Sequence, residues 1–151
     1  MPECTACQNR GKTWQGGDPV CAFPNGVFDS SNWNMRVFHH TDNDGKCAAA
    51  IVLLAYPSQD IQLTPVDYKD PFPFDGIKPN EEVWIVDFHL ATKENWERLL
   101  AITPNVKWFD HHVTAVEKFQ EYKDRIPGTR AVGKAGCMLV WEYLFPRRRF
   151  R

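Results

Sequence analysis

The sequence predicts an α/β fold: an open, mostly parallel β-sheet flanked by helices, preceded by a loop-rich segment that contains cysteines. Hydrophobic residues make up 43% of the 151 residues and charged residues 25%, which is ordinary globular composition. The composition changes near position 35, because residues 1–34 show no periodic apolar pattern. From Met35 onward, short apolar runs alternate with helical stretches, and such alternation indicates βαβ units.

Four short apolar runs are expected to form the strands. The strand at 83–86 has the strongest pattern, and Pro65 favours an edge position for the second strand because proline cannot donate to a ladder. Residues 70–76 contain two prolines and a glycine and are expected to form a loop. The four predicted strands are residues 36–39, 61–66, 83–86 and 106–109.

Four stretches between and after these runs are expected to form helices. Thr92 is a candidate N-cap, and Pro57 and Pro146 follow the ends of the first and last helical stretches. The four predicted helices are residues 46–54, 92–101, 114–123 and 135–144.

The charge and hydropathy pattern excludes several classes of protein. The formal net charge is −1 and the pI about 6.5, so no overall basic field points to nucleic acid. The longest apolar run, Cys47 to Tyr56, is too short to cross a bilayer, and the N-terminus has no apolar signal core. We therefore expect a soluble, cytoplasmic protein with no membrane partner.

Residues 1–34 contain three of the five cysteines. Cys4 and Cys7 form a C-x₂-C pair, and Cys21 follows. An odd cysteine count without a secretion signal favours thiols or metal ligands over disulfides. A zinc ribbon needs a fourth ligand near position 35, where Met35 is a poor one. Two interpretations stay open: a degenerate zinc site on these three cysteines, or a loop-rich arm with reduced thiols. Residues 35–151 form the second unit.

Acids and histidines follow three of the predicted strands at the point where each strand ends. In a parallel sheet the carboxyl ends of the strands lie along one edge, where ligands bind. Acidic groups gathered there repel each other unless a cation lies among them. Carboxylate and imidazole ligands suit Mn²⁺, with Mg²⁺ as the alternative, and the number of donors suits two ions. A structural role as caps and turns is the competing explanation. The three clusters are His39–Gly45, Asp87–His89 and Asp110–His112.

These clusters resemble the motifs of the DHH phosphoesterases. The tripeptide Asp110–His112 after an apolar strand is similar to the motif that names the family, and residues 40–45 are similar to its first motif. The strand that closes on Asp87 resembles the second motif, and the order and spacing agree. The resemblance covers residues 35 to about 145 and implies a manganese-dependent hydrolase, such as a nuclease, that cleaves phosphodiester bonds of short oligonucleotides or nucleotides.

The resemblance also implies roles for individual residues. The metal ligands would be His40, Asp42, Asp44, Asp87 and His111, with Asp87 bridging two ions. Asp110 would orient the histidines, and His112 would contact the scissile phosphate or the leaving group. Either His39 or His40 could be the ligand, because adjacent residues on a strand face opposite sides.

Lys134 is a further candidate for substrate binding. Residues 133–136 open the last helix, whose free N–H groups, together with Lys134, would suit a phosphate; a tight turn is the alternative. The family's further metal-binding aspartate and its second domain have no counterpart up to Arg151. Activity could therefore require a partner chain or a second copy to complete the site. The alternatives are a metal- and nucleotide-binding module without turnover, or a nucleic-acid binder led by a zinc ribbon.

Overall fold

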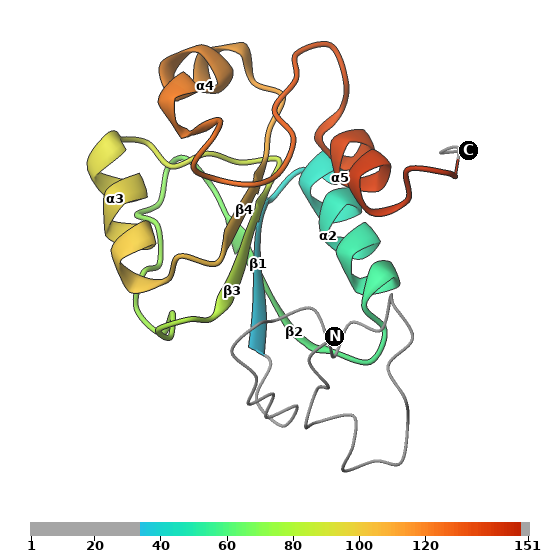
Figure 1. The fold of residues 1–151 in the computed structure, drawn as a ribbon, viewed down its shortest axis with the longest axis horizontal. Coiled ribbons are helices and arrows are strands. Elements are labelled where there is room, and N and C mark those ends of the chain that lie inside the picture. Colours follow the sequence, from blue (N-terminus) through green and yellow to red (C-terminus); the bar gives the residue numbers. More distant parts are fainter. Residues whose placement is uncertain (1–33, 149–151) are drawn as a thin grey trace, which may run out of the picture. The chain divides into compact units, whose positions relative to one another are not determined.

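The protein is described here by a computed structural model, which covers residues 34–148 (Figure 1). It confirms the α/β fold with a four-stranded, fully parallel sheet in the order β2-β1-β3-β4. All four predicted strands are present, and β2 lies at an edge, as Pro65 predicts. The strands are β1 (Asn34–His40), β2 (Asp60–Val66), β3 (Glu82–Val86) and β4 (Val106–Phe109).

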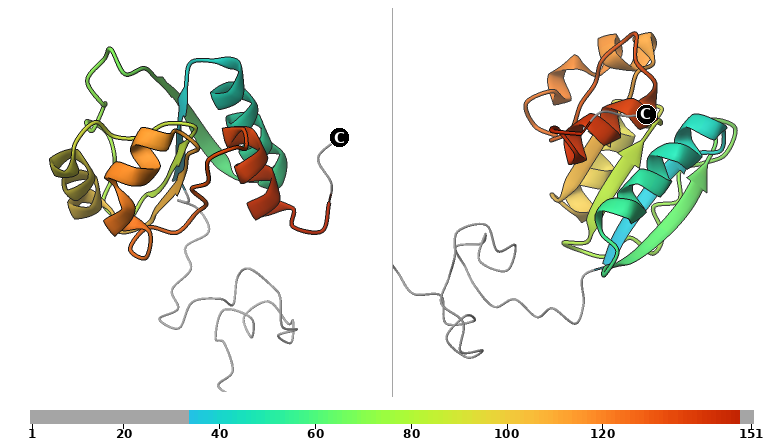
Figure 2. Two further views of the ribbon diagram at one scale, coloured as in Figure 1. Left: turned by 90° about the horizontal axis from the view of Figure 1, so that it is seen from above. Right: turned by 90° about the vertical axis from the view of Figure 1, so that its right-hand side faces the viewer.

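Helices cover both faces of the sheet. Helices α2 and α5 lie on one face and α3 and α4 on the other, as the views from the front and from above both show (Figures 1 and 2). The helix predicted at 114–123 is shorter than expected, because buried Phe119 leaves the helical backbone and a 3₁₀ turn follows at Gln120–Tyr122. The helices are α2 (Asn43–Ala55), α3 (Lys93–Ile102), α4 (Val113–Lys118) and α5 (Gly136–Leu144).

Side chains of the strands alternate between two apolar layers. Phe38 and Ile85 pack on the side of α3, where Trp96 and Leu99 are fully buried. Neighbouring strand residues face the other layer with α2 and α5, and Trp84 is one of them. The sheet is therefore fixed from both faces, which holds the carboxyl ends of its strands in place.

Side chains cap the N-termini of two helices, and one of these, α2, begins three residues earlier than the predicted Lys46. Thr92 Oγ1 accepts from the Asn95 N–H (3.2 Å), which confirms the expected N-cap of α3. Asp42 Oδ1 accepts from the Gly45 N–H (2.8 Å) and caps α2. A Cβ at Gly45 would lie 2.3 Å from the His40 carbonyl oxygen, so this tight passage from β1 into α2 requires glycine.

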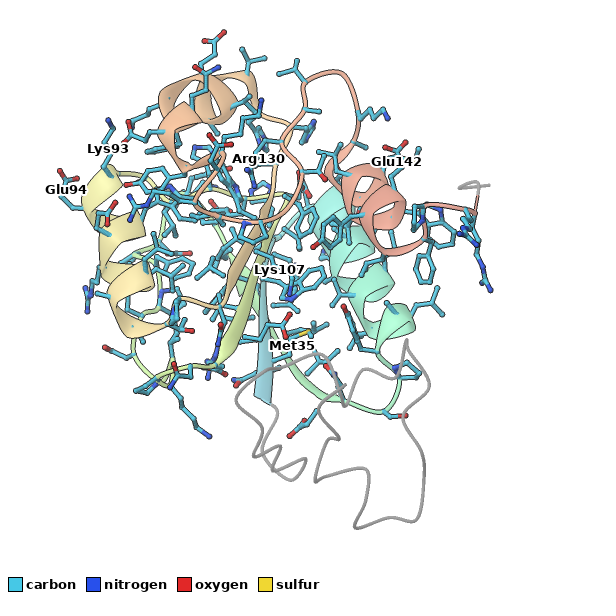
Figure 3. All side chains as sticks on the ribbon, viewed as in Figure 1. Met35, Lys93, Glu94, Lys107, Arg130 and Glu142 are labelled. Carbon is cyan, nitrogen blue, oxygen red and sulfur yellow. The ribbon has the colours of Figure 1, made fainter. Side chains whose placement is uncertain are left out.

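The segment after the 3₁₀ turn extends the edge of the sheet beside β4. The Trp108 N–H donates to Pro127 O (2.9 Å), and the Ala131 N–H donates to Asp110 O (3.1 Å). Arg130 donates to three main-chain carbonyls, those of Lys123, Ile126 and Trp108, and Figure 3 labels it at the upper end of the sheet. This segment therefore holds the end of β4, from which the DHH tripeptide continues.

Gly128→Ala is expected to lower the free energy of unfolding by roughly 2–4 kcal/mol. Gly128 has a φ of +122°, and a Cβ there would lie 2.1 Å from Trp108 O. Gly76 also has a positive φ, but its nearest atom would be 3.9 Å from the new Cβ. Urea denaturation of both variants checks this, and equal losses at the two positions would contradict the steric argument.

Two predictions fall outside the described part of the chain. The possible zinc ligands Cys4, Cys7 and Cys21, and the division of the chain at residues 34 and 35, belong wholly or in part to residues 1–33. Within residues 34–148, no helix has the length and apolar character needed to span a membrane.

Candidate metal centre

The carboxyl ends of β1, β3 and β4 bring the predicted acids and histidines together. His40 ends β1, Asp87 follows β3, and Asp110 follows β4; these ends lie at the top of the sheet in Figure 1. Three overlapping groups of possible ligand atoms form there, each with its atoms within 4.8 Å of one another. They are His40 with Asp42 and Asp87, Asp87 with His111 and His112, and His89 with Asp110 and His112.

The structure distinguishes the two histidines at the end of β1. His40 Nδ1 lies 2.9 Å from Asp42 Oδ2, although not in hydrogen-bond alignment. The buried His39 ring instead contacts the His40 carbonyl oxygen (2.8 Å). His40 therefore joins the acidic cluster, whereas His39 makes a local main-chain contact.

Asp87 is the most constrained residue of the site. It is fully buried, its φ is +52°, and neither of its carboxylate oxygens has a hydrogen-bond partner. A left-handed backbone at a non-glycine residue costs about 1–3 kcal/mol and is typical of functional sites. Burial, together with Asp44 and Asp42 nearby, raises the pKa of Asp87 to about 8.

His111 lies between two of the acids. Its Nε2 is 3.1 Å from Asp87 Oδ1 and 3.6 Å from Asp44 Oδ2. The Nε2 atom is therefore directed at the carboxylates, as expected of a residue that would share a cation with them.

Asp44 connects the cluster to the last helix. The Gly136 N–H donates to Asp44 Oδ2 (2.7 Å) and the Cys137 N–H donates to Asp44 Oδ1 (2.8 Å), so this carboxylate occupies the N-terminus of α5. The sequence predicted that free N–H groups at this helix would bind a substrate phosphate. At Gly136 and Cys137 these N–H groups instead donate to Asp44. Both oxygens keep further lone pairs, so Asp44 can still face a cation.

Lys134, the other part of the predicted phosphate contact, is paired elsewhere. Its Nζ donates to both carboxylate oxygens of Glu142 (2.7 and 2.8 Å), and Figure 3 labels Glu142 on α5. The structure thus places the Lys134 ammonium against the outside of α5, where it supports the helix.

Asp110 organises the DHH tripeptide from a fully buried position. Its Oδ1 accepts from the His111 N–H (2.8 Å), the His112 N–H (3.2 Å) and His112 Nδ1 (2.6 Å). Burial opposes ionisation of Asp110, but its contacts with His89 and His112 hold its pKa below the usual range. An ionised Asp110 fixes the His112 ring through Nδ1, which turns Nε2 away from Asp110.

Sequence reasoning assigned no role to His89 and missed Tyr68 altogether. Tyr68 Oη lies 2.9 Å from His89 Nδ1, and the Tyr68 ring stacks on Phe88 with centroids 4.6 Å apart. Tyr68 follows β2, so the same strand-end argument could have found it. However, a single tyrosine in the loop after a strand does not by itself indicate a functional site.

The donor set fits a divalent cation. A buried carboxylate with two unpartnered oxygens, surrounded by further acids and imidazoles, is unfavourable unless a proton or a cation neutralises it. Carboxylate and imidazole together suit Mn²⁺, and Mg²⁺ less well.

Comparisons with known proteins add evidence on the fold alone. No family model matches the chain, and no curated protein matches it. A crystal structure of an uncharacterized protein from Helicobacter pylori G27 is similar, with a TM-score of 0.54 and 17% sequence identity. The similarity covers 78% of this chain and 38% of that protein, so the chain spans well under half of its length.

Proposed function

We propose that residues 35–148 form the catalytic domain of a phosphoesterase that uses divalent metal, with Mn²⁺ as the favoured ion. The substrate class is the phosphodiester of a nucleotide or a short oligonucleotide. The observation that carries the proposal is Asp87, whose two buried oxygens make no aligned hydrogen bond although His111 and the acids of the first motif are close to them. The resemblance of the three motifs to the DHH family supports the same conclusion.

The residues divide into ligands and groups that act on the substrate. His40, Asp42 and Asp87 would hold one ion, and Asp44, Asp87 and His111 the other. Bound divalent ions supply an acidified water and neutralise charge on the phosphoryl group. His112, whose ring is fixed by Asp110, would contact a phosphoryl oxygen or the leaving group through Nε2.

The test compares wild type with Asp87→Asn in the full chain. Asparagine keeps the size of the side chain but cannot carry the negative charge. We expect Mn²⁺ binding, measured by calorimetry, to weaken strongly, and hydrolysis of a 5′-phosphorylated RNA dinucleotide to fall by roughly 10²–10³-fold. Asp75→Asn is the matched control because Asp75 is exposed and lies outside the three ligand groups.

The outcomes separate the possible functions. Loss of binding and hydrolysis in Asp87→Asn, with both intact in Asp75→Asn, supports the proposal. Tight Mn²⁺ binding by wild type without turnover would favour the metal- and nucleotide-binding module. Full hydrolysis by Asp87→Asn would eliminate the mechanism.

A further inference from the structure

His89 is not among the proposed metal ligands, but it contacts residues from two other segments of the site. Its Nδ1 lies 2.9 Å from Tyr68 Oη and 3.1 Å from Asp110 Oδ2. Its side chain is only 18% exposed. It lies two residues after Asp87, in the segment that follows β3, whereas Asp110 directly follows β4. His89 therefore joins the ends of two neighbouring strands to the loop after β2.

The two oxygens of Asp110 have very different surroundings. Oδ1 accepts from two main-chain N–H groups and from His112 Nδ1. Oδ2 is buried and has no aligned hydrogen bond, and the His89 imidazole is the ionic partner beside it. A buried carboxylate oxygen that faces no donor is disfavoured. His89 is thus the group that stabilises this side of Asp110.

The tautomer of His89 follows from its neighbours. Nδ1 faces two oxygens, the hydroxyl oxygen of Tyr68 and a carboxylate oxygen of Asp110, and oxygens of these kinds accept hydrogen bonds, so we assign a proton to Nδ1. Burial and the nearby Asp110 raise the pKa of Tyr68, so its hydroxyl stays neutral. The proton assigned to His89 Nδ1 therefore faces both Tyr68 Oη and Asp110 Oδ2, which lie 2.9 and 3.1 Å from Nδ1.

Direct metal binding is a poor explanation of this group. The His112 Nδ1 to Asp110 Oδ1 distance of 2.6 Å is that of a short hydrogen bond. Adjacent ligands of one octahedral ion lie roughly 3.0 Å apart when each bond is about 2.1 Å, so the His112–Asp110 contact is shorter than a shared ion of that kind allows. His89, Asp110 and His112 therefore form a hydrogen-bonded support beside the acidic cluster.

We propose that His89 is a positioning residue: through its Nδ1–H it fixes the Asp110 carboxylate, which in turn sets the orientation of His112, and Tyr68 holds the His89 ring in place. The inference rests on the proposed function for its kinetic readout. The orientation of His112 is a separate readout that requires no turnover.

Three substitutions distinguish the nitrogen atoms of His89. His89→Asn places an amide N–H near the position of Nδ1, His89→Gln places it near Nε2, and His89→Ala removes both. A positioning role through Nδ1 predicts rescue by asparagine only. A direct contact of Nε2 with substrate predicts rescue by glutamine only.

The first measurement is ¹⁵N-edited NMR of the histidine side chains in the full chain. In wild type, the His112 Nδ1–H in its short hydrogen bond to Asp110 should give a downfield signal. We expect this signal to be lost in His89→Ala and His89→Gln and kept in His89→Asn. An unchanged His112 signal in His89→Ala would overturn the inference, even if metal-dependent hydrolysis is demonstrated.

The second measurement is the steady-state hydrolysis of the dinucleotide with Mn²⁺. We expect kcat to fall by roughly 10–100-fold in His89→Ala and His89→Gln, with KM and Mn²⁺ affinity close to wild type. Recovery by glutamine instead of asparagine would overturn the positioning role. If His89→Ala does not fold, the asparagine and glutamine variants still decide the question. If wild type itself does not hydrolyse the substrate, the proposed function fails. The NMR result still tests whether His89 fixes Asp110 and His112.

Discussion

Gly136→Ala is expected to disrupt the candidate metal centre, although alanine is the better helix former. Alanine inside a helix is favoured over glycine by about 1 kcal/mol. A Cβ at Gly136, however, would lie 2.6 Å from Asp87 Oδ1 and 2.8 Å from Asp87 Cβ. Because Asp87 is fully buried and its backbone is already strained, it cannot move aside easily. We expect a loss of roughly 2–4 kcal/mol in the free energy of unfolding.

On the proposed function, the same variant should bind Mn²⁺ about 10–100-fold more weakly, because the new methyl group would displace the Asp87 carboxylate. Gly133→Ala is the matched control. Gly133 has a φ of +91° but open space around its Cβ position, so the change strains the backbone without touching Asp87. Calorimetric titration and urea denaturation of both variants provide the check. Normal Mn²⁺ affinity in Gly136→Ala would show that the close approach of α5 to Asp87 is unimportant.

In the metal-free protein, the free energy of unfolding is expected to fall as the pH rises from about 5 to about 8. The pKa of Asp87 is raised to about 8 in the folded protein, mainly by burial and then by Asp44 and Asp42. In the unfolded chain the same group ionises near its ordinary value of about 4. Between these values the folded state holds one more proton than the unfolded state, so raising the pH favours unfolding by at most about 1.4 kcal/mol per pH unit.

The pKa values of Asp42 and Asp110 are lowered, so these residues act in the opposite direction. Their contribution is lost only as the pH falls below about 4, outside this window. Urea denaturation with a chelator at several pH values measures the slope. We expect Asp87→Asn to flatten it, and saturating Mn²⁺ to reverse it, because metal binds the ionised form. An equally steep fall in Asp87→Asn would assign the slope to another group.

The fold was predictable because its signals are local. Short apolar runs such as 83–86, the N-cap at Thr92 and the proline after the last helix indicate where elements begin and end. The gathering of His40, Asp87 and Asp110 was also predictable, since it follows from parallel strands that end at one edge. Helix α4 ended early because Phe119 is drawn into the apolar layer around Trp96, which is a tertiary effect.

The parts of the site that could not be predicted depend on contacts between distant segments. Asp44 and Gly136 are 92 residues apart, and no pattern in either segment indicates that one caps the other. The contact between Lys134 and Glu142 is hidden for a different reason. A lysine at the start of a helix suits a phosphate as well as a glutamate two turns later. Whether the chain binds metal or hydrolyses phosphodiesters stays a prediction.

The hydrogen bonds between Asp44 and the N-terminus of α5 have a consequence for folding without metal. The positive end of the helix dipole already offsets one of the crowded negative charges, before any ion arrives. The sheet edge therefore has one of its carboxylates stabilised by the protein itself, and we expect the chain to fold without an ion as a template. An ion bound at the proposed site would then add stability to a chain that is already folded.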